Sequence, residues 1–109
     1  MKSPGDAVLL RAFVNQDDKC RGLPLYEAIV LKAREMHLDG ATVLRGPIGF
    51  GRSRRIHATK VFQLVHDLPI VVEIVDSQDK IDGFLPALDQ LMSGGIVTIE
   101  KIKVLRYGS

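Results

Sequence analysis

The chain has 109 residues and a mass of 12.0 kDa, and its 46% hydrophobic and 26% charged residues are the proportions of one globular domain, residues 1–109. Its 15 Lys and Arg and 13 Asp and Glu leave a net charge of +2, which is too small to indicate a polyanionic partner. The single cysteine, Cys20, excludes an intrachain disulfide, and the lack of a long apolar stretch or a signal-peptide pattern predicts a cytoplasmic protein.

The first part of the chain predicts a strand, a helix and a second strand. Residues 7–14 form a short apolar run between polar residues, which is typical of a strand. A helix is expected from Pro24, because apolar residues follow three or four positions apart, and Gly40 is expected to end it. Residues 41–45 predict another strand.

The second part predicts a strand, a helix and a last strand. Residues 68–75 are almost continuously apolar and rich in β-branched side chains, which favours a central strand covered on both faces. A polar pair at 76–77 can cap the next helix, which we expect to kink or to restart at Pro86. Residues 96–107 predict the last strand, with a bulge near Lys101 where the alternation shifts.

This order, βαββαβ, is that of the α+β ferredoxin-like fold, a four-stranded antiparallel sheet with two helices on one face. The strands at 7–14 and 68–75 are then central. Because two helices cover only one face, one set of their alternating apolar residues stays exposed in a single chain, namely Leu9, Phe13, Val71 and Val75 or their alternates. Self-association about a symmetry axis would cover them, and the alternative is a monomer with an open apolar face.

Residues 46–67 predict a long flexible loop, whose first part is rich in glycine and arginine. Glycines let backbone N–H groups approach an anion, and arginines offer forked donors to phosphate oxygens, so the pattern favours a phosphate-bearing ligand. The alternative is a solvated hairpin connection, since neither the Walker loop nor the dinucleotide fingerprint is present. The residues concerned are Arg45, Gly46, Gly49, Gly51, Arg52, Arg54 and Arg55.

Other polar residues carry weaker signals. The three histidines, His37, His57 and His66, have no spacing typical of a metal site, so we expect no dedicated metal, and we interpret Cys20 as inert. Glu73 interrupts an apolar central strand, which predicts that it lies at a subunit seam, pairs with an arginine or faces a ligand cleft.

Several motifs follow one another in a characteristic order along the chain. They are Pro24-Leu25-Tyr26-Glu27-Ala28-Ile29, Gly40-Ala41-Thr42-Val43-Leu44-Arg45-Gly46, Gly49-Phe50-Gly51-Arg52, His57, Asp67-Leu68-Pro69-Ile70-Val71-Val72-Glu73-Ile74-Val75-Asp76 and Phe84-Leu85-Pro86. Over about residues 7–107 they resemble the PII nitrogen-signalling proteins, and more closely the PII-like branch that is catalogued mainly as a domain of unknown function.

The resemblance implies a signalling protein without catalytic or metal-binding residues and without an obligatory cofactor. It implies a homotrimer whose sheets face inward and which binds an adenine nucleotide (AMP, ADP, ATP or cyclic AMP) in clefts between subunits. The loop after the second strand would then change conformation with ligand and engage a partner, such as a membrane transporter, a channel or an enzyme. Nucleic acid is not expected as a partner.

The resemblance also implies site residues. By resemblance, nucleotide binding falls to Gly49, Phe50, Gly51, Arg52 and Arg106. The residue patterns above add Arg45, Gly46 and Glu73 to this set, and partner binding is assigned to Arg54, Arg55 and His57. The sequence departs from the PII pattern at two places. The only tyrosines are Tyr26 and Tyr107, so the loop lacks the tyrosine that is nucleotidylated in PII. The phosphate-holding loop before the last strand is reduced to Ser93-Gly94-Gly95, which favours a nucleotide with fewer than three phosphates.

Three other functions fit parts of the pattern. An acylphosphatase-type hydrolase shares the fold class, but its anion loop would be Asn15–Leu23, where Lys19 and Arg21 lie in an acidic setting. A trimer with three basic loops could bind nucleic acid, although Phe50 and Phe62 are the loop's only aromatic residues. A CutA-type metal-related function is not favoured by the histidine spacing.

Overall fold

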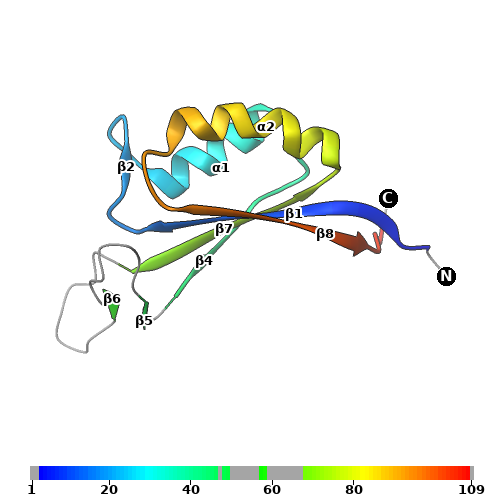
Figure 1. Cartoon of the computed structure of the whole chain (residues 1–109), viewed down its shortest axis with the longest axis horizontal. Coiled ribbons are helices and arrows are strands. Elements are labelled where there is room, and N and C mark those ends of the chain that lie inside the picture. The colour runs from blue at the N-terminus through cyan, green and yellow to red at the C-terminus, as the bar shows by residue number, and fades with distance from the viewer. Residues whose placement is uncertain (1–2, 47, 50–56, 59–67, 109) are drawn as a thin grey trace.

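The computed structural model describes residues 3–46, 48–49, 57–58 and 68–108. Its main sheet is antiparallel with the strand order β4-β7-β1-β8, and both helices lie side by side on one face of it (Figure 1). The elements are β1 (Gly5–Asn15), α1 (Leu25–Glu35), β4 (Thr42–Arg45), β7 (Pro69–Asp76), α2 (Gln78–Leu91) and β8 (Ile96–Val104). The predicted ferredoxin-like fold, with its first and third strands central, is therefore confirmed.

Two short hairpins accompany the main sheet. Strands β2 (Lys19–Cys20) and β3 (Leu23–Pro24) pair before α1, and β5 (Ile48–Gly49) pairs with β6 (His57–Ala58). Both pairs are two residues long and carry no periodic pattern, so the sequence predicts only loops there. Most of the predicted loop 46–67 lies outside the described residues.

The core lies between the sheet and the helices. Alternate residues of the two central strands point toward the helices, because side chains alternate between the two faces of a strand. Full burial of such an apolar side chain stabilises the fold by about 1.5–3 kcal/mol. The most buried large side chains are Leu10, Ile29, Ile70, Val72, Ile74, Ile81 and Phe84.

Helix α1 ends earlier than predicted. The backbone of His37 takes a positive φ of 62°, and the N–H of Leu38 donates to the carbonyl of Ala33 at 3.0 Å. This hydrogen bond closes the left-handed turn that is typical of helix ends. The prediction that Gly40 ends the helix is wrong, because His37 already takes the left-handed conformation.

Helix α2 runs without a break through Pro86. Ser77 caps it, and its hydroxyl oxygen accepts from the backbone N–H of Lys80 at 3.3 Å. Pro86 lacks the N–H that would reach the carbonyl of Asp82, but both residues are exposed and water can satisfy that carbonyl. The predicted restart at Pro86 therefore does not occur.

Strand β8 pairs with β1 one to one, from Ile96 opposite Phe13 to Val104 opposite Gly5. The predicted bulge near Lys101 is wrong, and the strand ends at Val104 rather than at 107. Most apolar residues in the first part of β8 lie on one face of the strand, and those in the second part lie on the other face. The alternation of apolar and polar residues therefore shifts although the pairing with β1 is regular.

Candidate functional site

The face of the sheet opposite the helices is uncovered. Leu9, Phe13, Val71 and Val75 point to it, because the intervening residues of β1 and β7 are buried under the helices. Phe13 keeps 39% of its surface exposed, and Leu44 on β4 and Ile96 on β8 keep 48% and 57%. Apolar side chains therefore occur on all four strands of this face, which confirms the predicted open apolar surface of a single chain.

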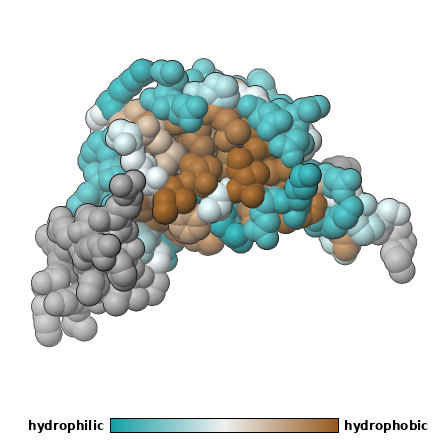
Figure 2. All heavy atoms as spheres, viewed as in Figure 1, coloured by the Kyte–Doolittle hydropathy of each residue, from teal (hydrophilic) through white to brown (hydrophobic). Residues whose placement is uncertain are grey.

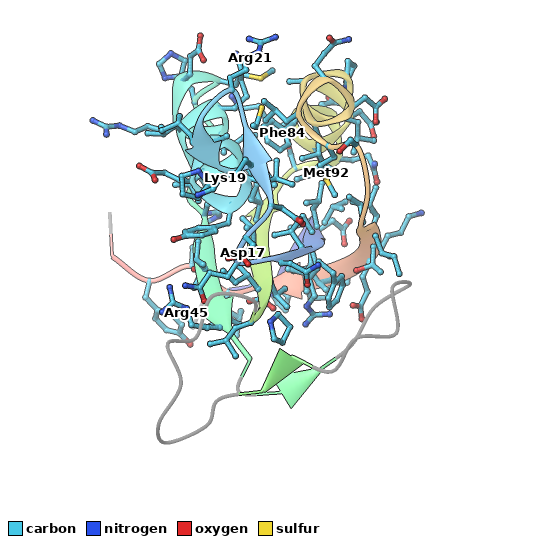
Figure 3. All side chains as sticks on the ribbon, turned by 90° about the vertical axis from the view of Figure 1, so that its left-hand side faces the viewer. Asp17, Lys19, Arg21, Arg45, Phe84 and Met92 are labelled. Carbon is cyan, nitrogen blue, oxygen red and sulfur yellow. The ribbon has the colours of Figure 1, made fainter. Side chains whose placement is uncertain are left out.

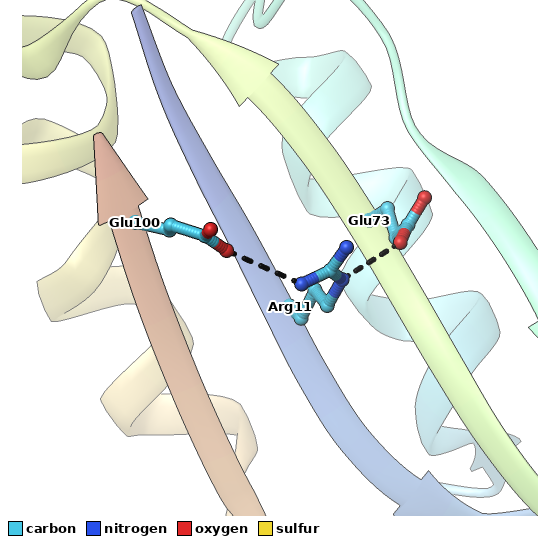
Figure 4. Close-up of polar contacts among 3 residues, drawn as sticks. All are labelled: Arg11, Glu73 and Glu100. Atoms are coloured by element: carbon cyan, nitrogen blue, oxygen red, sulfur yellow. Dashed lines mark hydrogen bonds and ion pairs between the residues drawn. The ribbon is translucent and has the colours of Figure 1, made fainter. Parts of the chain in front are cut away.

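A charged group lies in the middle of this open face. Figure 4 shows Arg11 of β1 between Glu73 of β7 and Glu100 of β8. The Nε of Arg11 donates to Oε2 of Glu73 at 2.8 Å, and its Nη1 lies 3.4 Å from Oε1 of Glu100. The hydrogen bond to Glu73 raises the pKa of Arg11, which partial burial opposes. Of the three predicted explanations for Glu73, pairing with an arginine is the one observed within the chain.

The base of the predicted loop is built on the edge strand β4. Arg45, its last residue, is exposed, and the N–H of Gly46 donates to the carbonyl of Pro69 at 2.8 Å. A Cβ at Gly46 would lie 2.9 Å from Cγ of Pro69, so this close approach requires glycine. The backbone of Gly49 pairs with that of His57. The other predicted loop residues, Phe50, Gly51, Arg52, Arg54 and Arg55, lie outside the described residues.

The basic residues of the β2–β3 hairpin do not join Arg45. Figure 3 shows Asp17, Lys19 and Arg21 along the hairpin, with Arg21 farthest from Arg45. Lys19 and Arg21 are both exposed and stand beside the helix layer.

Arg106 lies at the opposite end of the sheet, where a chain of polar contacts holds it. Its Nη2 is 2.9 Å from Oδ2 of Asp39, in the turn between α1 and β4. The N–H of Asp39 donates to Oδ2 of Asp76 at 3.0 Å, and Oδ1 of Asp76 accepts from the N–H of Ser77 at 2.7 Å. Asp76 is only 5% exposed. The sequence interpretation of Asp76 as a helix cap missed its link to Asp39, because no local pattern indicates so distant a partner.

The sheet register separates the two predicted phosphate-binding arginines. Arg45 pairs with Ile70 near the start of β7, whereas Asp39, which holds Arg106, is anchored on Asp76 at its end. The two positions are therefore six residues apart along β7, which corresponds to roughly 20 Å. Within one chain the structure does not bring Arg45 and Arg106 together.

A groove runs beside the Asp39 turn. It has a volume of about 510 Å³, which is within the range of small-molecule pockets. Apolar residues form much of its lining, and Arg34, His37 and Asp39 supply polar groups. The lining residues are Val30, Ala33, Arg34, His37, Leu38, Asp39, Gly40 and Ala41.

Neither helix within the described ranges is long and apolar enough to cross a membrane. Among the side chains that the structure describes, no three of His, Cys, Asp or Glu are grouped so that they could hold a metal ion.

Comparison with known proteins gives a family for most of the chain. The family model DUF190, described as "Uncharacterized ACR, COG1993", matches residues 7–104. A UPF0166 protein of Aquifex aeolicus (strain VF5) is 39% identical over 97 residues, which cover 89% of this chain and 91% of that protein. A UPF0166 protein of Methanocaldococcus jannaschii is 29% identical over 101 residues, covering 92% and 93% of the two chains.

Several solved structures that share the fold are of PII-like proteins. CPII from Thiomonas intermedia K12, bound to ADP and bicarbonate, aligns with a TM-score of 0.64 at 16% identity, covering 97% of this chain and 95% of that one. Another CPII structure, bound to ADP, AMP and bicarbonate, has a TM-score of 0.66 at 15% identity and covers 97% and 94%. A protein from Thermus thermophilus, described as a putative PII-like signaling protein, has a TM-score of 0.68 at 14% identity and covers 94% and 92%.

Proposed function

Because the chain belongs to the DUF190 family and has a PII-like fold, we propose that it is a PII-like regulatory protein rather than an enzyme. It binds an adenine nucleotide between the subunits of a homotrimer. Binding changes the conformation of the segment 46–67, which alters the affinity of the protein for a partner.

The uncovered sheet face is the observation that carries this proposal. Phe13, Leu44 and Ile96 are large apolar side chains, and each keeps more than a third of its surface exposed in the single chain. Soluble proteins rarely leave such a contiguous surface to water, and a second copy of the same chain is the simplest cover for it. A trimer packs three such faces around one axis.

The edge strand β8 extends the apolar surface to the side of the molecule. Ile99 on its helix side is 47% exposed, in addition to Ile96 on the open face. Figure 2 shows apolar surface between the helices and the sheet. An exposed edge also presents unpaired backbone groups, so β8 is a second surface for contact between copies.

The charged group on the open face is compatible with its burial in a trimer. Arg11 is paired with Glu73 and Glu100 of its own chain, at 2.8 and 3.4 Å. Neighbouring subunits would therefore cover the ion pair of Arg11 with Glu73 rather than an isolated charge, which would be costly to bury, while the second carboxylate, Glu100, is the more exposed of the two. Glu73, proposed as a nucleotide-binding residue, stays on this shared face.

The separation of the arginines supports a site between subunits. Arg45 and Arg106 would reach one phosphate group only from different copies, because within one chain roughly 20 Å of strand separates Arg45 from the Asp39 turn that holds Arg106. In the proposed site, the end of β4 and the loop base of one subunit face the Arg106 segment of its neighbour. The proposed residues are Arg45, Gly46, Gly49, Phe50, Gly51, Arg52, Glu73 and Arg106.

An adenine nucleotide is the proposed ligand because CPII, of the same fold, is found with ADP and AMP. Residues 93–95 are exposed, and only Ser93-Gly94-Gly95 stands where the PII proteins that the chain resembles have a longer phosphate-holding loop. We therefore favour AMP or ADP over ATP. The proposed partner contact is the basic set Arg54, Arg55 and His57, which suits an acidic protein surface on a transporter, a channel or an enzyme.

Calorimetry tests the proposal directly. We expect AMP, ADP, ATP or cyclic AMP to bind the wild-type protein at micromolar concentrations. Arg45→Ala removes a charged donor to phosphate, which is worth about 1.5–3 kcal/mol, so affinity should fall by about ten- to a hundredfold. Lys80→Ala, a charge loss in the first turn of α2, should leave affinity unchanged. If none of the four nucleotides produces heat, the proposal is wrong.

A further inference from the structure

The contact between Arg106 and Asp39 joins the proposed phosphate-binding cation to a carboxylate of the same chain. Nη2 of Arg106 lies 2.9 Å from Oδ2 of Asp39, with side-chain exposures of 63% and 52%. An arginine donates to a carboxylate in much the same geometry as to a phosphate. In this structure Asp39 therefore occupies donor positions of Arg106 that a phosphate group would use.

The backbone of Asp39 is held independently of its side chain. Its N–H donates to the buried carboxylate of Asp76 at 3.0 Å, and that carboxylate also accepts from Ser77 at 2.7 Å. The turn between α1 and β4 is thus fixed to the start of α2 while the carboxylate of Asp39 remains exposed. Loss of the contact with Arg106 would free the Asp39 side chain without releasing the turn.

The same carboxylate lines the groove of about 510 Å³ at the end of α1. A ligand phosphate that approached Arg106 would meet the negative charge of Asp39 at close range. Both the ion pair and this repulsion oppose the binding of an anion. Because the pair is exposed, the opposition is modest and a ligand can overcome it.

We propose that Asp39 is an internal competitor for the anionic ligand of Arg106. The carboxylate occupies Arg106 when no ligand is bound, and the phosphate of the ligand displaces it. The pair lowers the affinity for ligand and keeps Arg106 at the end of α1 until the ligand arrives. This inference rests on the proposed function, since it takes Arg106 as a phosphate-binding residue.

The test compares ADP binding to wild-type protein and to Asp39→Asn by calorimetry. Exposed pairs contribute about 0.2–1 kcal/mol, so the variant should bind ADP roughly 1.4- to fivefold more tightly. Glu27→Gln, the same neutralisation in the first turn of α1, should change nothing. In an Arg106→Ala background, the effect of Asp39→Asn should become smaller, because the ion pair is gone and only the repulsion between Asp39 and the phosphate remains. Equal or weaker binding by Asp39→Asn would overturn the inference.

A second probe separates this inference from the proposed function. The NMR signal of the Arg106 side-chain N–H can be titrated with inorganic pyrophosphate in both proteins. We expect the pyrophosphate concentration at the midpoint of this titration to be lower in Asp39→Asn than in the wild type, by a factor similar to that expected for ADP, whether or not nucleotides bind. If ADP does not bind but this shift occurs, the proposed nucleotide function fails and the competition stands. If the wild-type protein binds ADP, but neither ADP nor pyrophosphate binds more tightly to Asp39→Asn than to the wild type, only the inference fails.

Discussion

Two carboxylates position two of the arginines that the structure describes. Glu73 holds Arg11 on the open face of the sheet, and Asp39 holds Arg106 at one end of it. Both pairs join residues from different elements, so each carboxylate fixes a guanidinium over a long distance in sequence. Arg45, at the loop base, is exposed on the edge strand.

Gly95 is a residue whose substitution tests the described packing. Its φ is +97°, and a Cβ there would lie 2.6 Å from the carbonyl oxygen of Phe13. We expect Gly95→Ala to lower the free energy of unfolding by about 2–4 kcal/mol, from backbone strain and steric overlap together. Urea unfolding followed by circular dichroism, at one fixed protein concentration, measures the change.

Gly83→Ala is the matched control. Gly83 lies in α2 with open space around it, so alanine should raise the free energy of unfolding by about 0.5–1 kcal/mol through its higher helix propensity. Equal effects of the two substitutions would show that the turn before β8 is not packed against β1 as described.

Between elements, Asp76 is the main polar connection. Its buried carboxylate accepts from the N–H groups of Ser77 and Asp39, and so joins the end of β7 to the start of α2 and to the turn before β4. Asp39 lies in this turn, and its side chain pairs with Arg106. One carboxylate thus positions the surroundings of the proposed phosphate-binding arginine.

Asp76→Ala leaves both N–H groups without their acceptor. We expect a loss of about 2–4 kcal/mol in the free energy of unfolding, because two part-buried hydrogen bonds to a charged acceptor are lost and each is worth at most about 1.5–3 kcal/mol. Asp89→Ala, at an exposed position late in α2, should change stability by less than about 0.5 kcal/mol. Thermal unfolding of both variants measures the two changes. If Asp76→Ala leaves the free energy of unfolding unchanged, Asp76 does not connect these elements as its hydrogen bonds indicate.

The elements with strong periodicity could be predicted from the sequence. The apolar runs at 7–14 and 68–75 correspond to the central strands, and the helical spacing of apolar residues marks α1 and α2. The paired two-residue strands could not be predicted, because so short a ladder has no pattern. Neither could the position of Arg106, since its contact with Asp39 joins residues that are far apart in sequence.

For the whole molecule, the important feature is a sheet with one covered and one uncovered face. The helices bury the side that carries Leu10 and Ile74, and the opposite side exposes Phe13 and Leu44. A chain of 109 residues has a small core, so covering this face with other copies would add substantially to its stability. The same association would unite arginines that one chain keeps apart.

Native mass spectrometry of the protein with ADP tests this association and the proposed ligand together. We expect a species of about three times the 12.0 kDa of the chain, carrying up to three nucleotides, and no nucleotide on single chains. The double variant Phe13→Glu with Leu44→Glu places charges on the open face and should give single chains without ADP, whereas Leu31→Glu on α1 should remain trimeric. ADP bound to single wild-type chains, or trimers that bind none, would contradict a nucleotide site built between subunits.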